Sequence, residues 1–189
     1  MVDQQTESVH RDFIKPVAII FLMCVLLWVA LDIARVALAQ RAVANDVNEA
    51  MALTEDGAYL RAMHRLQQAE EKRLRSRGKT AHFWMEKVRP FDSEMQRRLS
   101  DAHKALAIRF SDERFAALAE RHYTLALLHD PEAAGLTGRL ATEAFYTKNY
   151  ELGWVAIQIA KNDPRSRTPQ PLVRFFEDNY TGPRHRFDE

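Results

Sequence analysis

At 189 residues, the chain has room for one compact domain and a membrane anchor. It is 47% hydrophobic and 28% charged, with six Gly and seven Pro, a balance that favours helices and disfavours a disordered chain. The net charge of +1 excludes a strongly polybasic nucleic-acid-binding protein, and the single cysteine, Cys24, excludes an intramolecular disulfide and a cysteine zinc cluster.

A hydrophobic segment near the amino terminus is the first element of the chain. The fifteen residues from Val17 to Leu31 carry no charged or strongly polar side chain. As a helix they span about 22 Å, less than the roughly 30 Å of a bilayer's hydrocarbon core. A helix over residues 14–38 covers that thickness, with Pro16 in its first turn. The sequence therefore predicts a short tail over residues 1–13 and a transmembrane helix over residues 14–38.

Two other interpretations compete with the anchor. Ala37-Leu38-Ala39 before Gln40 fits the cleavage pattern of a secretory signal peptide. A buried helix of a soluble domain is the other, but fifteen apolar residues in a row leave no polar face. The region before the hydrophobic run is long and contains acidic as well as basic side chains, which disfavours a signal peptide. An uncleaved anchor is the favoured interpretation, and whether the segment is ever cleaved stays open.

The orientation of this span is weakly determined by charge. Arg11 and Lys15 precede the hydrophobic run, and Arg35 and Arg41 follow it, so the count of flanking basic residues is a tie. A short tail before a long translocated domain is the common single-pass arrangement. We therefore expect a single-pass membrane protein with a cytoplasmic amino terminus, and in a bacterium an inner-membrane protein with its helical domain in the periplasm.

Two charged residues lie near the end of the span. Asp32 and Arg35 stand three residues apart, so they share one helical face and can pair with each other. They can also pair with charged groups of a partner helix, because ionisable residues within a span are costly unless paired. Both interpretations keep the two side chains out of bare lipid.

The chain after the span is predicted to be helical. Residues 39–55 form a stalk, residues 56–179 a soluble helical domain, and residues 180–189 a tail. Asp56 is expected to cap a helix that Gly78 ends. Its apolar stripe is narrow, and the rest of its surface is expected to be solvated. The stripe consists of Leu60, Met63, Leu66 and Leu74, and the charged run of Glu70, Glu71, Lys72, Arg73, Arg75 and Arg77.

Further helices follow in order. A short one over residues 80–89 ends at Pro90, and the next begins at Asp92 or Ser93 and runs to Phe110. Ser111 or Asp112 is expected to cap the following helix, and three more are expected over residues 133–148, 150–162 and 170–179. No run alternates with the period of a strand. The predicted fold class is therefore all-α.

One stretch of this helical region resembles a tetratricopeptide repeat. Residues 140–164 carry Leu140 and Ala141 at the close helix contact, and Asn149-Tyr150 at the turn between helices. Gly153 and Ala160 then stand at small-residue positions, and Pro164 at the terminating proline. The resemblance covers residues 106–164, and it implies helical hairpins whose groove binds a peptide or a partner helix.

A search for catalytic chemistry finds no established motif. The seven histidines are scattered, with no HExxH and no histidine pair four residues apart. His82 and Glu86 are four residues apart, but a solvated or capping role is the simpler interpretation. There is no CxxCH, GxxxxGK or GxSxG. We therefore predict no catalytic, cofactor-binding or metal-binding residue, no cofactor, and a chain that is not an enzyme.

These observations predict a membrane-anchored accessory or assembly subunit. Its expected partners are the lipid bilayer and a larger membrane protein complex, and no nucleic acid. The residues expected to contact the partner are Asp32, Arg35, Tyr146, Tyr150 and Trp154, although helical spacing also suits a core role for the three aromatic residues. Two alternatives stay open: a ligand-binding or enzymatic helical domain with an unrecognised site, and a homo-oligomerising membrane stalk.

Overall fold

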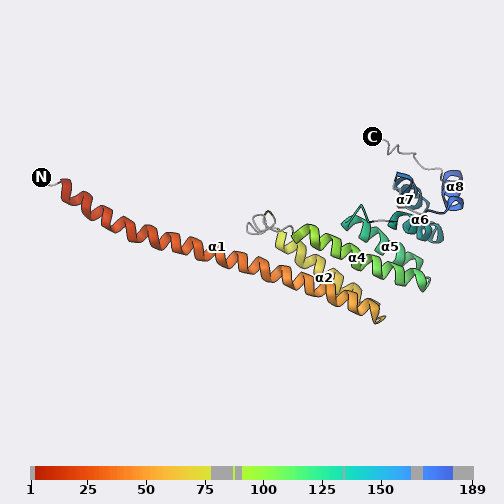
Figure 1. Cartoon of the computed structure of the whole chain (residues 1–189), viewed down its shortest axis with the longest axis horizontal. Coiled ribbons are helices and arrows are strands. Elements are labelled where there is room, and N and C mark those ends of the chain that lie inside the picture. Colours follow the sequence, from red (N-terminus) through yellow and green to blue (C-terminus); the bar gives the residue numbers. More distant parts are fainter. Residues whose placement is uncertain (1–2, 78–86, 88–90, 134, 163–167, 181–189) are drawn as a thin grey trace.

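The computed structural model describes residues 3–77, 87, 91–133, 135–162 and 168–180. Every secondary-structure element in these ranges is an α-helix, in agreement with the all-α prediction (Figure 1). The helices are α1 (Asp3–Glu55), α2 (Tyr59–Arg77), α4 (Phe91–Asp112), α5 (Ala116–His129), α6 (Leu136–Thr147), α7 (Tyr150–Asn162) and α8 (Gln170–Asn179).

Helix α1 is continuous through the predicted tail, span and stalk. Its 53 residues extend for about 80 Å at 1.5 Å per residue. Because α1 begins at Asp3, Pro16 lies inside the helix and not in its first turn, as its sequence position had suggested. Figure 1 shows the amino-terminal part projecting alone, while the carboxyl-terminal part lies against α2 and α4.

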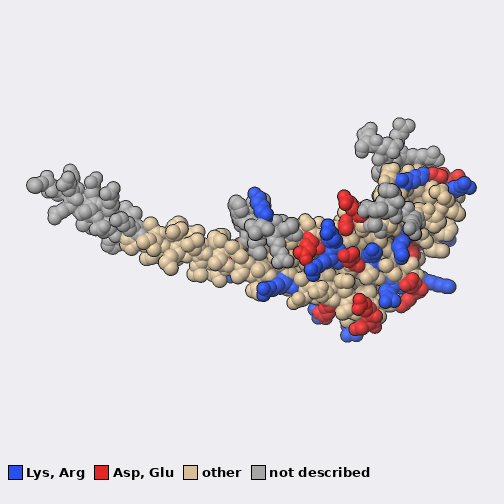
Figure 2. Space-filling view, in the orientation of Figure 1, with Lys and Arg blue, Asp and Glu red and all other residues tan. Residues whose placement is uncertain are grey.

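The two parts of α1 have different surroundings. In the free half, residues 17–33, the large apolar side chains are 40–70% exposed. From Pro16 onward, the helix that contains this half is long and apolar enough to cross a membrane, and Figure 2 shows the free half as a mostly uncharged surface. In the packed half, residues 36–50, Val36, Val43 and Val47 are fully buried. Their spacing of seven and four residues places them on one face of the helix.

Helix α2 returns along the packed half of α1 after a tight turn. Gly57 has a φ of 75°, which glycine adopts without a steric cost. The Asp56 N–H donates to the Ala52 carbonyl at 3.0 Å, so the Asp56 backbone completes the end of α1. The structure shows no hydrogen bond from the Asp56 side chain to α2 among the described residues, and α2 begins three residues later, at Tyr59. The next helix begins close to the expected place, whereas the described residues do not show the capping role expected of Asp56.

The buried face of α2 differs from the predicted stripe. Its buried residues Ala62, Leu66, Ala69 and Arg73 are spaced by four, three and four positions. Leu60 and Leu74, which were expected in the stripe, are 83% and 59% exposed. The small side chains of the two buried alanines allow α1 and α2 to approach closely. The stripe prediction is therefore correct at Leu66 and wrong at both of its ends.

Some charged residues of α2 that were expected to be solvated instead form ion pairs with neighbouring helices. The buried Arg73 pairs with Asp92 of α4 through Nη1 and Oδ1 at 2.9 Å. The Lys72 ammonium lies 2.5 Å from Oδ2 of Asp46, a buried residue of α1. A buried carboxylate or guanidinium is tolerated only when it is paired. These residues therefore tie α2 to both of its neighbours.

The chain from α4 onward forms consecutive packed helices. Helix α4 extends through Ser111 and Asp112, which were expected to cap the next helix, so that prediction is wrong. Arg114 adopts a φ of 64° in the loop, and Phe115 is the amino-terminal cap residue of α5. Ser111 instead donates to the buried Glu143 carboxylate of α6 at 2.5 Å.

Helices α7 and α8 approach each other closely at one small residue. A Cβ added at Gly153 of α7 would lie 2.2 Å from Cε1 of Phe176 in α8, far inside van der Waals contact. Phe176 is fully buried. Gly153 therefore lets an aromatic ring of α8 fill the space directly over the α7 backbone.

Candidate functional site

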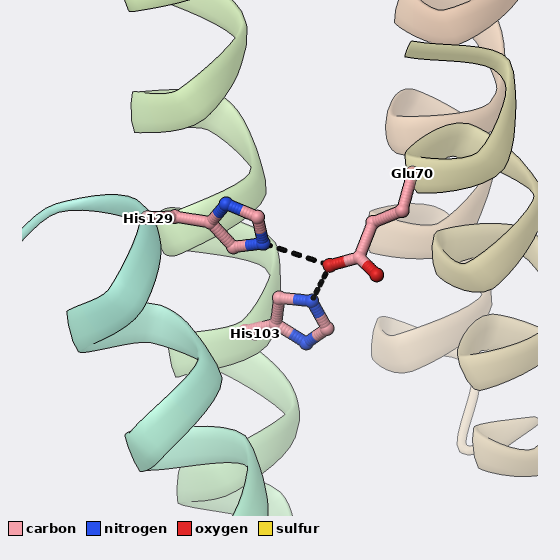
Figure 3. Close-up of side chains that lie close together, drawn as sticks. All are labelled: Glu70, His103 and His129. Atoms are coloured by element: carbon pink, nitrogen blue, oxygen red, sulfur yellow. Dashed lines mark hydrogen bonds and ion pairs between the residues drawn. The ribbon is translucent and has the colours of Figure 1, made fainter. Parts of the chain in front are cut away.

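Three helices bring a carboxylate and two imidazoles together. Glu70 of α2 faces His103 of α4 and His129 of α5, and both rings point at the same carboxylate oxygen (Figure 3). The distance from Glu70 Oε1 is 2.7 Å to His129 Nε2 and 3.4 Å to His103 Nε2. One ligand-type atom from each residue lies within 4.8 Å of the other two.

The local helix pattern explains why these side chains point inward. Glu70 follows the buried Ala69 on α2, and His103 follows the buried Ala102 on α4. His103 is 3% exposed, so its ring belongs to the packed interior. His129 is the last residue of α5, where a histidine side chain is favoured by the helix dipole. Packing of the three helices therefore places the cluster between α2 and the pair α4 and α5.

A third histidine, His122, hydrogen-bonds the ring nitrogen of His103 that faces away from Glu70. The Nδ1 atoms of His103 and His122 lie 3.0 Å apart, so one of them donates a hydrogen to the other. The His122 ring also stacks on Phe110, with 5.5 Å between ring centroids. His122 is buried, and its Nε2 atom has no hydrogen-bond partner among the described residues. His122 therefore holds the orientation of the His103 ring while keeping one polar atom unpaired.

The charges of the cluster follow from burial and hydrogen bonding. Hydrogen bonds from His103 and His129 hold the pKa of the Glu70 carboxyl well below its usual range, so that Glu70 is a carboxylate at neutral pH. Burial, with further contributions from the His103 and Arg121 charges, lowers the pKa of His122 to about 4. His122 is therefore a neutral imidazole at neutral pH, and its Nδ1 can accept a hydrogen bond.

A cavity of about 310 Å³ lies beside the cluster. Glu70, His103 and His122 form part of its wall, together with apolar side chains of Leu60, Met63 and Leu125 and polar side chains of His64, Gln67 and Arg121. Such a volume holds several water molecules. The carboxylate and the imidazoles are thus accessible to a small solute as well as to one another.

Two chemical roles suit this geometry. The first is structural, because a carboxylate that accepts two histidine hydrogen bonds ties α2 to α4 and α5. The second is cation binding, because two imidazole nitrogens and one carboxylate oxygen are ligands that divalent transition metals take. His82 and Glu86, the pair with helical spacing in the sequence, lie outside the described residues.

The sequence search missed this cluster for a clear reason. Glu70 is 33 residues from His103 and 59 residues from His129, so no short motif contains them. The available signal was the position of His103 on the apolar face of its helix, four residues after the buried Leu99. A histidine on a buried face needs a polar partner, but the helix pattern does not say which.

The residues predicted to contact a partner lie in two separate places. Asp32 and Arg35 lie on α1 near the end of the free half, and the ion pairs between described residues do not join them. Tyr146 and Tyr150 are 67% and 39% exposed on α6 and α7. Trp154 is 8% exposed and stacks on Tyr180 with 5.1 Å between ring centroids, which gives it a core position.

An aromatic surface surrounds Tyr146 and Tyr150. Phe145 contacts both Tyr146 and Phe175 of α8, with ring centroids 5.5 and 4.8 Å apart. Tyr150 reaches Phe175 at 5.8 Å. We use the name aromatic surface for these four residues, Phe145, Tyr146, Tyr150 and Phe175. Three of them are more than a third exposed. Aromatic ring surface therefore faces solvent on the last three helices of the chain.

Comparison of the chain with protein-family models, with curated proteins and with solved structures finds no match.

Proposed function

We propose that the chain is a non-catalytic, membrane-anchored accessory or assembly subunit that binds a partner protein. The observation that carries this proposal is the continuity of α1, whose exposed apolar free half runs without a break into the packed half. An apolar helix with no packing partner is stable in lipid, where its backbone hydrogen bonds are satisfied internally. A continuous helix would hold the domain close to the bilayer at a set angle.

The charged end of the free half supports binding to a membrane partner. Asp32 is partly exposed and Arg35 is exposed, and both lie where the apolar run ends. If the span lies over residues 14–38, the two charges fall near the membrane interface. A partner helix with complementary charge would remove the cost of placing them there.

The aromatic surface of α6, α7 and α8 supports binding of a protein at a second place, away from the span. Exposed aromatic side chains are enriched at protein interfaces because they bury large areas with little loss of conformational entropy. We propose that α6 and α7 form a tetratricopeptide-like hairpin. Two residues, Lys148 and Asn149, join these helices, and each helix from α4 to α7 packs on the next. A groove of such hairpins would accept a peptide or helix.

The inner membrane of a bacterium, with the helical domain in the periplasm, is the proposed location. Protease treatment of spheroplasts from cells that produce the full chain tests this orientation. Loss of the helical domain with retention of a small membrane-embedded fragment is expected. Protection of the domain until the membrane is dissolved would contradict the orientation, though not the membrane anchor.

Affinity purification of the full-length chain from native membranes in mild detergent tests the partner proposal. Mass spectrometry should find a membrane protein in stoichiometric amounts. Two variants separate the two surfaces: Asp32→Leu with Arg35→Leu for the span, and Tyr146→Ala with Tyr150→Ala for the aromatic surface. Each should weaken recovery of the partner about tenfold or more. Tyrosine is enriched among the few interface residues that carry most of the binding energy, and the loss of both span charges removes their pairing with the partner helix.

Leu128→Ala is the matched control, because Leu128 is 71% exposed on α5 and lies outside the aromatic surface. It should leave partner recovery unchanged. Purification of the wild-type chain alone, as a monomer, would contradict the proposal. Recovery of only further copies of the chain would assign it to a homo-oligomeric stalk instead.

A further inference from the structure

We propose that Glu70, His103 and His129 bind one divalent first-row transition-metal ion, such as Zn²⁺, between α2, α4 and α5. The proposal is independent of the membrane anchor and of any partner protein. It rests on the donor atoms that the three helices bring together, on the hydrogen bond behind His103, and on the cavity beside the cluster.

The donor atoms are close to the geometry that a small ion requires. Ligands about 2 Å from a tetrahedral ion lie about 3.3 Å from one another. His103 Nε2 lies 3.4 Å from Glu70 Oε1, His129 Nε2 lies 2.7 Å from it, and no separation within the set exceeds 4.8 Å. Small changes in side-chain torsion would bring all three to coordinating distance. Two nitrogens and one oxygen favour a transition metal over Mg²⁺ or Ca²⁺, which prefer oxygen alone.

The contact between His103 and His122 fits the second layer of a metal site. A histidine that binds a metal through one ring nitrogen commonly donates the hydrogen of the other to a fixed acceptor. Here His103 Nε2 faces the cluster, and His103 Nδ1 lies 3.0 Å from His122 Nδ1. With a metal on His103 Nε2, the hydrogen resides on His103 Nδ1 and is donated to His122. The metal would thus select one of the two hydrogen-bond directions that this pair allows.

The cavity supplies room for a further ligand. Three protein donors leave at least one position of a tetrahedral ion open. Glu70 and His103 both line the 310 Å³ cavity, so a water molecule could complete the coordination from that side. The same cavity gives an ion a path from solvent to the buried His103 side chain.

Direct titration of the full-length chain tests the site. The chain is produced without a polyhistidine tag, kept in detergent, stripped with EDTA and titrated with Zn²⁺ against a chromophoric chelator. One ion per chain should bind at low micromolar concentration or below, and Zn²⁺ should raise the melting temperature. Co²⁺ should give the intense visible absorption of a four-coordinate site. Mg²⁺ and Ca²⁺ at the same concentration should change neither signal.

Four variants separate this site from other histidines. His129→Gln and Glu70→Gln remove ligands at partly exposed positions, where folding should tolerate the change. His122→Phe keeps all three ligands but removes the acceptor behind His103, and should weaken binding about 10- to 100-fold. Each ligand variant should lose more than that. His10→Gln is the control, because His10 lies near the start of α1, before the free half, and the Zn²⁺ affinity of this variant should be unchanged.

Circular dichroism of each metal-free variant shows whether it remains folded. Absence of Zn²⁺ binding to the folded wild-type chain would overturn the proposal. Unchanged binding in the folded double variant Glu70→Gln, His129→Gln would also overturn it, because the ion would then be bound by other histidines. The three residues would in that case be a hydrogen-bonded clamp between helices.

Discussion

The free half and the packed half of α1 are consecutive stretches of one helix with opposite surroundings. Residues 17–31 of the free half are apolar on every side and remain exposed, whereas residues 36–50 are apolar on one stripe and bury it against α2 and α4. Helix formation alone does not distinguish them. The difference lies in the polar residues around the helix, such as Asn45 and Glu49, which give the packed half a water-facing side.

The comparison also separates two kinds of stability. The packed half contributes to the free energy of unfolding of the domain, because its side chains lose contacts with other helices when the domain unfolds. The free half has no such contacts among the described residues, so substitutions there should leave that free energy unchanged. They should change only the free energy of membrane insertion.

The largest expected effect comes from placing a charge in each half. Val47→Asp buries a carboxylate at a fully buried position of the packed half, and should lower the free energy of unfolding by about 3–5 kcal/mol. Leu27→Asp in the free half should leave it within about 0.5 kcal/mol of wild type. Urea unfolding in detergent, followed by far-UV circular dichroism, measures both. Equal losses would mean that the two halves of α1 do not differ in their contacts.

The same two variants should have the opposite order of effects on membrane insertion. Leu27→Asp should weaken membrane insertion by about 3 kcal/mol, because a charge near the centre of a span is costly. Val47→Asp should leave insertion unchanged. Extraction of membranes with alkaline carbonate, followed by quantification of the retained chain, measures this effect.

The next effect in size is a dependence of domain stability on pH. The pKa of His122 is lowered from 6.5 to about 4 on folding, so below pH 6.5 the unfolded chain binds a proton that the folded chain does not. The free energy of unfolding should therefore fall by up to about 3 kcal/mol as the pH decreases from 6.5 to 4. At lower pH, Glu70 adds a second loss. Its pKa is lower in the folded chain than in the unfolded chain, so protonation of the Glu70 carboxylate by acid further lowers the free energy of unfolding.

Denaturant unfolding at several pH values in the presence of EDTA checks this prediction. His122→Phe should flatten the slope between pH 6.5 and 4, since Phe keeps an aromatic ring beside Phe110 and carries no titratable group. An unchanged slope in this variant would assign the pH dependence to other groups. The free half should add nothing to the slope, so Leu27→Ala serves as the matched control.

A smaller loss is expected from overpacking at the far end of the domain. Gly153→Ala places a methyl group against the buried Phe176 ring, and should lower the free energy of unfolding by about 1–3 kcal/mol. The double variant Gly153→Ala, Phe176→Leu should lose less than the sum of the two single variants, because the smaller side chain makes room for the methyl group. Additive losses, measured by thermal and urea unfolding, would show that the clash is not the cause.

Local sequence patterns predicted the helices better than their ends. The helical boundaries near Gly57 and Pro169 follow from residues that act on their own backbone. The end of α4 was misplaced because Ser111 and Asp112 are good cap residues in isolation, yet both remain in α4 and Ser111 donates to Glu143 of α6. A contact with a residue 32 positions away overrode the local preference.

The candidate site was not predictable in the same way. His103 could be recognised as a buried-face histidine, but Glu70 was one charge within a run that read as a solvated face. Leu60 and Leu74 likewise read as a stripe, whereas the structure buries Ala62 and Ala69 of α2 instead. Both errors arise because a helix has several faces, and the sequence does not say which neighbour each face meets.

The sequence by itself determined the all-α class, the apolar run near the amino terminus, and the presence of most of the helices. Hydrophobic periodicity, Gly and Pro shape the backbone of the nearest few residues. Their effects can therefore be predicted from the sequence pattern alone. Only the tertiary structure brought Glu70 to His103 and His129, placed His122 behind them, and set Phe176 over Gly153. Those contacts depend on how whole helices pack, and packing is decided by shape and polarity summed over residues far apart in the chain.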